Sequence, residues 1–64
     1  MKKLLASAAS LEDLAKIIND YFYSKNYIIQ PGGSIYNTKT KKTLTNYRVR
    51  KASDRFRFEW GDDV

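Results

Sequence analysis

The 64-residue sequence contains no cysteine and no histidine, and it has only one proline and three glycines. Without cysteine the chain can form no disulfide, and without either residue it lacks the ligands of the usual zinc sites. Histidine is also the most common general base in enzymes. The fold must therefore be stabilised by packed aliphatic and aromatic side chains, and we expect a single small domain over residues 1–64.

Carboxylates are few, and their predicted positions do not converge on one site. Glu12 and Asp13 are adjacent on a predicted helix and point to different sides. Asp62 and Asp63 fall in a predicted acidic tail, residues 61–64, which lacks the converging ligands of a metal site. No serine has a histidine to activate it. We therefore expect no enzymatic activity, no catalytic residue, no bound metal and no cofactor.

The first nine residues combine two lysines, two leucines and several small residues, as a signal peptide does. Their apolar stretch is too short for the hydrophobic region of such a peptide. No other segment is long enough to cross a membrane. We expect a cytoplasmic protein without membrane association, in which residues 1–9 are frayed or extend the first helix.

Residues 10–24 are predicted to form an amphipathic helix. Ser10 is a suitable N-cap, and Asp13 follows it at the spacing of a capping box. Asn26 is predicted to end the helix in the left-handed conformation. One stripe of side chains is apolar and is expected to face the core: Leu11, Leu14, Ala15, Ile18 and Phe22.

The remainder of the chain is predicted to be β-structure. Residues 27–30 are a candidate short strand, and residues 31–34 form a turn whose spacing matches no phosphate-binding loop. Strands are predicted over residues 34–38, 43–50 and 55–60, joined by a lysine-rich hairpin tip at 39–42 and a turn at 51–54. The predicted fold is therefore α+β, with one N-terminal amphipathic helix packed on a three-stranded antiparallel β-meander.

Basic residues are concentrated in the second half of the chain. The net charge is +5, but residues 39–57 hold eight basic residues and a single acid, Asp54, which gives that segment +7 and the rest −2. Such an asymmetric charge attracts polyanions. The eight basic residues are the candidate nucleic-acid-binding site: Lys39, Lys41, Lys42, Arg48, Arg50, Lys51, Arg55 and Arg57.

The last predicted strand alternates between aromatic and charged residues, which places Phe56, Phe58 and Trp60 on one face. The preceding strand alternates in the same way. If the two strands pair, like charges come to lie on opposed positions, where they repel unless an anion neutralises them. The face opposite the aromatic residues then carries four arginines: Arg48, Arg50, Arg55 and Arg57.

The planar fork of arginine suits phosphate groups, and an exposed tyrosine such as Tyr36 could stack on a base. The sequence therefore favours a small nucleic-acid-binding protein, for DNA or RNA, of the kind found among phage and mobile-element accessory proteins. Three alternatives stay open. The charged face could be an ordinary solvated surface, with Glu59 and Asp54 pairing with the arginines. It could dock, as an inhibitor or adaptor, on an acidic protein partner. A strand edge or the helix could also support a homodimer.

Overall fold

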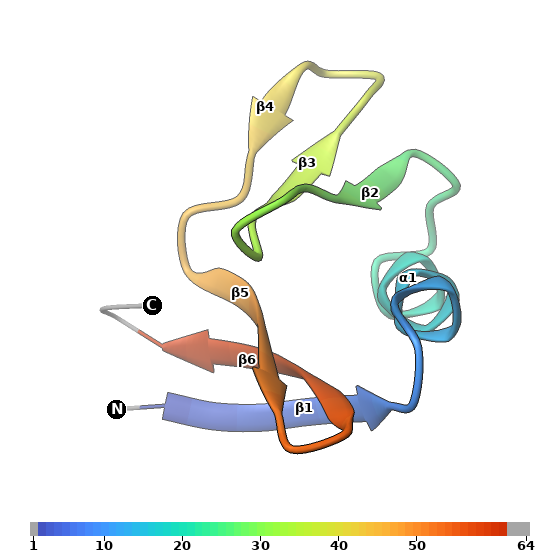
Figure 1. The fold of residues 1–64 in the computed structure, drawn as a ribbon. Coiled ribbons are helices and arrows are strands. Elements are labelled where there is room, and N and C mark those ends of the chain that lie inside the picture. The colour runs from blue at the N-terminus through green and yellow to red at the C-terminus, as the bar shows by residue number, and fades with distance from the viewer. Residues whose placement is uncertain (1, 62–64) are drawn as a thin grey trace.

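A computed structural model of the chain describes residues 2–61. Over these residues the chain forms one helix and six strands. Their order is β1 (Lys2–Ala8), α1 (Leu11–Tyr21), β2 (Tyr27–Ile29), β3 (Ile35–Asn37), β4 (Lys42–Thr43), β5 (Tyr47–Ala52) and β6 (Arg55–Gly61). The strands form two antiparallel sheets, the terminal sheet with order β1-β6-β5 and the small sheet with order β2-β3-β4 (Figure 1). The predicted α+β class is confirmed.

The predicted pairing of the last two strands is confirmed. β5 and β6 form a hairpin in which Val49 lies opposite Phe58 and Ala52 opposite Arg55. The turn between them contains only two residues, and Ser53 takes the positive φ of 58° that so tight a turn requires. The turn is shorter than the predicted 51–54, because residues 51 and 52 belong to β5.

The prediction for the N-terminal residues is wrong over residues 2–8. These residues are neither frayed nor helical, but form β1, which pairs with β6 in the terminal sheet. A bulge between Leu4 and Ala6 inserts one extra residue, so that Leu5 and Ala6 both pack against the core while Leu4 stays 49% exposed. The bulge removes the simple alternation that would identify a strand in the sequence. Met1, and residues 62–64 of the predicted tail, lie outside the described residues.

The helix begins where the sequence predicts. The side chain of Ser10 accepts a hydrogen bond from the backbone N–H of Asp13 at 3.1 Å. The helix ends at Tyr21, earlier than expected, and Tyr23 rather than Asn26 takes the left-handed conformation, with φ 51°. At 11 residues, α1 is too short to cross a bilayer, and no helix within residues 2–61 has the length and apolar character to do so.

The strand predicted over residues 43–50 is divided into two strands that belong to different sheets. β4 ends at Thr43 and β5 begins at Tyr47. Between them Leu44 turns inward, packs against the core and donates its backbone N–H to the carbonyl of Ile35 at 2.9 Å. The chain passes from the small sheet to the terminal sheet at this contact. The predicted meander is therefore divided, with β3 and β4 in the small sheet and β5 and β6 in the terminal sheet.

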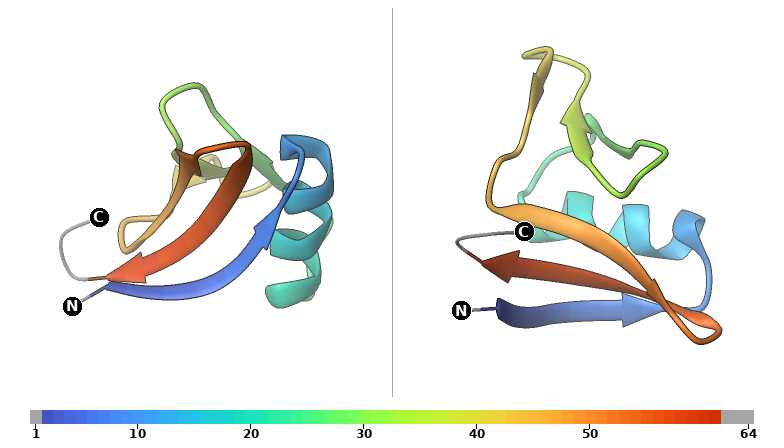
Figure 2. Two further views of the ribbon diagram at one scale, coloured as in Figure 1. Left: turned by 60° about the horizontal axis from the view of Figure 1, so that its bottom comes forward. Right: turned by 60° about the vertical axis from the view of Figure 1, so that its left-hand side comes forward.

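The core lies between the terminal sheet, α1 and the β2–β3 hairpin, and Figure 2 shows α1 across one face of the terminal sheet. Aromatic rings connect these elements. Phe22, at the end of α1, packs within 5.1 Å of the ring of Tyr47, whose ring stacks 5.7 Å from that of Phe58. The fully buried residues come from all three parts of the fold: Leu14, Ile18, Ile35 and Phe58. The opposite face of the terminal sheet is turned away from the helix.

Candidate nucleic-acid interface

β5 and β6 place all four arginines on the face of the terminal sheet opposite α1. Their register sets Arg50 directly opposite Arg57, and Arg48 opposite Glu59, while Val49 and Phe58 on the reverse side are buried. This confirms the predicted alternation of the two strands. We call this surface the arginine face, and it consists of Arg48, Arg50, Arg55, Arg57 and Glu59.

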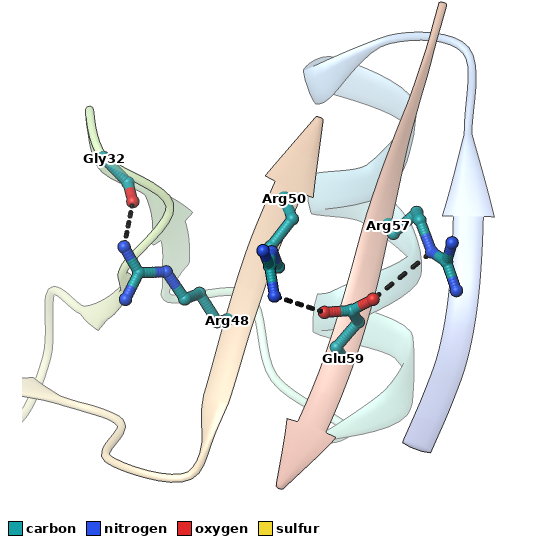
Figure 3. A network of polar contacts seen from close by, with 5 residues as sticks. All are labelled: Gly32, Arg48, Arg50, Arg57 and Glu59. Carbon is teal, nitrogen blue, oxygen red and sulfur yellow. Dashed lines mark hydrogen bonds and ion pairs between the residues drawn. The ribbon is translucent and has the colours of Figure 1, made fainter. Parts of the chain in front are cut away.

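Glu59 lies at the centre of the arginine face and is only 8% exposed. One carboxylate oxygen lies 3.3 Å from Nε of Arg57, and the other lies 3.9 Å from Nη1 of Arg50 (Figure 3). The two arginine side chains are 50% and 42% exposed. Because Arg50 and Arg57 face each other across the strands, the carboxylate between them offsets their repulsion. The expected pairing of Glu59 with the arginines is confirmed.

The ion pairs at Glu59 are poorly aligned. Within the described residues, Nε of Arg57 and Oε1 of Glu59 are buried and make no hydrogen bond. A buried polar group without a hydrogen bond costs about 1–3 kcal/mol. The carboxylate therefore neutralises one charge without using all the donors of the two guanidinium groups. Four arginines and one glutamate leave the face with a net charge of +3.

Arg48 is directed away from Glu59. Its Nη2 donates to the carbonyl of Gly32 at 3.2 Å, in the turn between β2 and β3 (Figure 3). The same turn is fastened to the outer edge of β5, where the N–H of Val49 donates to the carbonyl of Gly33 at 2.8 Å. Gly33 has φ 94°, and a side chain there would overlap the carbonyl oxygen of Val49. These contacts place Arg48 beside the turn, at the side of the arginine face.

A hollow of about 520 Å³ lies beside Arg48, between the turn and β5. Its apolar lining includes Ile29, Val49 and Phe56, and Arg50 also lines it. Lys51 projects from the reverse side of β5, with its ammonium group 5.9 Å from the centre of the Phe56 ring. Lys51 also lines the hollow, as do Arg48 and Arg50.

The remaining three predicted residues lie elsewhere. Lys39, Lys41 and Lys42 are exposed on the β3–β4 hairpin. In Figure 1 and in the right-hand view of Figure 2, this hairpin lies at the end of the molecule opposite β6. The structure thus brings the four arginines together on one face, with Lys51 on the reverse side of β5, and it separates all five from the lysine-rich tip.

Comparisons with models of protein families, with curated proteins and with solved structures find no match for this chain. Its function must therefore be inferred from the charge and geometry of its own residues. Within residues 2–61, carboxylates do not gather in the groups of three or more that could hold a metal ion, and Asp62 and Asp63 lie outside that range.

Sequence reasoning missed the most exposed aromatic residue. Tyr36, the predicted stacking platform, is half-buried in the small sheet, whereas Tyr23 after the helix is 97% exposed. One signal was present in the sequence, because three aromatic residues follow one another at positions 21–23 and cannot all face the core. Phe22 packs against the core, and Tyr23 points into solvent.

Proposed function

We propose that the protein binds nucleic acid, and that the arginine face is the contact surface. The observation that carries this proposal is the gathering of four arginines on one sheet face with a single buried carboxylate, which leaves a net charge of +3. Like charges on opposed strand positions destabilise a sheet. A phosphate backbone laid across the face would remove that repulsion and would accept hydrogen bonds from the unused guanidinium donors.

Each arginine of the face has a separate part in this proposal. Arg50 and Arg57 are partly neutralised by Glu59, so they contribute donors more than net charge. Neither ion pair of Glu59 involves Arg55, whose exposed side chain is therefore proposed as a full phosphate contact. Arg48 and the neighbouring hollow extend the surface along the outer edge of β5.

The proposed protein is a non-enzymatic binding protein, and its proposed location is the cytoplasm, where nucleic acids are accessible. Binding that releases condensed counterions depends strongly on salt, so the observed affinity should fall linearly with salt on a logarithmic scale. Titration with a duplex and with single strands of DNA and RNA at several salt concentrations measures both the affinity and this slope. Absence of binding at low salt would refute the proposal.

Arg55 is the sharpest position for a variant, because its removal leaves both ion pairs of Glu59 in place. Arg55→Gln should reduce the salt slope by about 0.7–0.9, the value for one phosphate contact. Lys16→Gln is the matched control, since it removes the same charge from an exposed position on α1, on the other side of the sheet. Equal effects of the two substitutions would show that binding responds only to overall charge.

An acidic protein is the second candidate partner, and the apolar lining of the hollow beside Arg48 favours it. Protein interfaces combine apolar anchors with arginine, whereas phosphate contacts need no apolar surface. Affinity capture before and after nuclease treatment separates the two candidates. A single acidic protein that is retained after nuclease treatment, with no affinity of the pure chain for nucleic acid, would replace the first proposal by the second.

A further inference from the structure

Tyr23 is held in an unfavourable conformation without any packing that would explain it. It is 97% exposed and has φ 51°. Its N–H donates to the carbonyl of Asp20 at 3.2 Å, and the N–H of Ser24 donates to the carbonyl of Asn19 at 2.9 Å. These are the two hydrogen bonds of a Schellman motif, in which the left-handed residue is usually glycine. The large aromatic side chain at this position makes the motif less stable and is directed into solvent.

The tyrosine lines a hollow of about 850 Å³, whose other residues come from the end of α1, the loop that follows it and the β3–β4 hairpin. The hollow combines one aromatic ring with two ammonium groups, three carboxamides and one carboxylate. These groups belong to Tyr23, Lys25, Lys39, Asn19, Asn26, Asn37 and Asp20. Two lysines and one aspartate give it a net positive charge. It is separate from the arginine face and includes only Lys39 of the predicted basic residues.

Hydrogen bonds fix the two walls of this hollow. The carbonyl of Asn26 accepts from both the N–H and the hydroxyl of Thr38, at 2.8 and 3.0 Å, which ties the loop after α1 to the hairpin. Oδ1 of Asn37 accepts from the N–H groups of Lys39 and Thr40, at 2.8 and 3.1 Å. The backbone that carries Lys39 is thus held in place beside Tyr23, so the hollow does not have to form on binding.

We infer that Tyr23 is a stacking platform for one unpaired base of a single-stranded nucleic acid, and that Lys25 and Lys39 bind the phosphates next to that base. This inference rests on the proposed function and adds to it the class of ligand. Lysines alone would serve any anion, but an exposed ring that shares a hollow with two lysines suits a base that is not stacked in a duplex. Bases inside a duplex cannot reach such a ring without being flipped out.

Tyr23→Gly tests the inference without endangering the fold, because glycine is the residue that this backbone conformation favours. Tyr23→Phe is the matched control, which keeps the ring. The probes are a fluorescent 12-nucleotide thymidine strand and a 12-base-pair duplex, both at low salt. Stacking is worth about 1–3 kcal/mol per base, so Tyr23→Gly should weaken single-strand binding by about 5- to 140-fold. Tyr23→Phe should stay within about twofold of wild type, and neither variant should change duplex affinity.

A second readout is photocrosslinking of a 5-iodouracil-substituted strand, followed by mass spectrometry, which should place the crosslink on Tyr23. Single-strand binding by Tyr23→Gly at wild-type strength would overturn the inference, as would an equal loss in Tyr23→Phe or an equal loss of duplex binding. If wild type still binds and Arg55→Gln still weakens binding, the proposed function survives that result. If the wild-type protein binds neither probe, both proposals fail.

Discussion

Glu59→Gln should change stability and nucleic-acid affinity in opposite directions. The substitution keeps the size and shape of the side chain but removes the only acid of the arginine face, which raises the net charge of that face from +3 to +4. Arg50 and Arg57 then face each other across β5 and β6 with no carboxylate between them. The free protein becomes less stable, while a bound phosphate meets one more unneutralised arginine.

The expected loss of stability lies between two limits. Removing one partner of a fully buried ion pair costs about 3–5 kcal/mol, whereas an exposed pair contributes about 0–1 kcal/mol. Glu59 is 8% exposed but its partners are half-exposed, and the pairs are 3.3 and 3.9 Å long. We therefore expect a loss of about 1–2 kcal/mol, or a decrease in Tm of about 4–16 °C in a domain of this size. The total stability of such a domain is about 3–10 kcal/mol, so the variant stays folded at 25 °C.

Affinity should increase by roughly 5-fold at low salt if the added charge is worth about 1 kcal/mol, and the salt slope should become steeper by up to about 0.9. Thermal melting and salt-dependent titration on the same preparation measure both effects. Glu12→Gln is the control, because it removes a carboxylate from the exposed first turn of α1. A folded Glu59→Gln protein whose affinity equals or falls below that of wild type would refute the reasoning about the arginine face.

Three further predictions concern the fold. Gly32 and Gly33 have φ values of 95° and 94°, but only at Gly33 would a side chain overlap a backbone carbonyl. Gly32→Ala should therefore lower the free energy of unfolding in urea by about 1–2 kcal/mol and Gly33→Ala by about 3–5 kcal/mol; equal losses would contradict the close contact with β5. Burial, with a smaller contribution from neighbouring tyrosine hydroxyls, raises the pKa of Tyr47. The folded chain holds this proton more tightly than the unfolded chain, so the associated stability is present below about pH 10 and is lost as the pH rises through the folded pKa. Tyr47→Phe should make unfolding less pH-dependent above about pH 10, and an unchanged alkaline profile would count against this cause. Finally, the bulge at Leu5 and the two lysines of β1 disfavour pairing at that sheet edge, so sedimentation at high concentration should show a monomer.

The features that sequence predicts correctly depend on residues close together in the chain. Ser10 caps a backbone group three residues away, so the start of α1 follows from local chemistry. The arginine face follows from two alternating strands joined by a short turn, in which each residue's face is fixed by its position. Distant contacts are not required for either prediction.

The features that sequence misses depend on distant contacts. β1 owes its existence to pairing with β6, and its bulge at Leu5 conceals the alternation. Leu44 ends β4 because it packs against a core built from other elements. The sequence places Glu59 correctly on the outer face, but its burial depends on two arginines, one of them on the other strand. Tyr23, and not Asn26, takes the left-handed conformation after the helix. Residue type alone would favour asparagine for that conformation.

The pairing of β1 with β6 also sets when the protein can fold during synthesis. Paired positions on these strands are 48–59 residues apart, from Ala8 with Phe56 to Lys2 with Gly61. A ribosome adds about 5–20 residues per second, so β1 waits roughly 2–12 s for its partner. During this interval the central strand of the terminal sheet does not exist, and Phe58, the largest fully buried side chain, is missing from the core. We therefore expect the terminal sheet to form only after β6 has been synthesised, and its formation to be limited by the closing of one long loop.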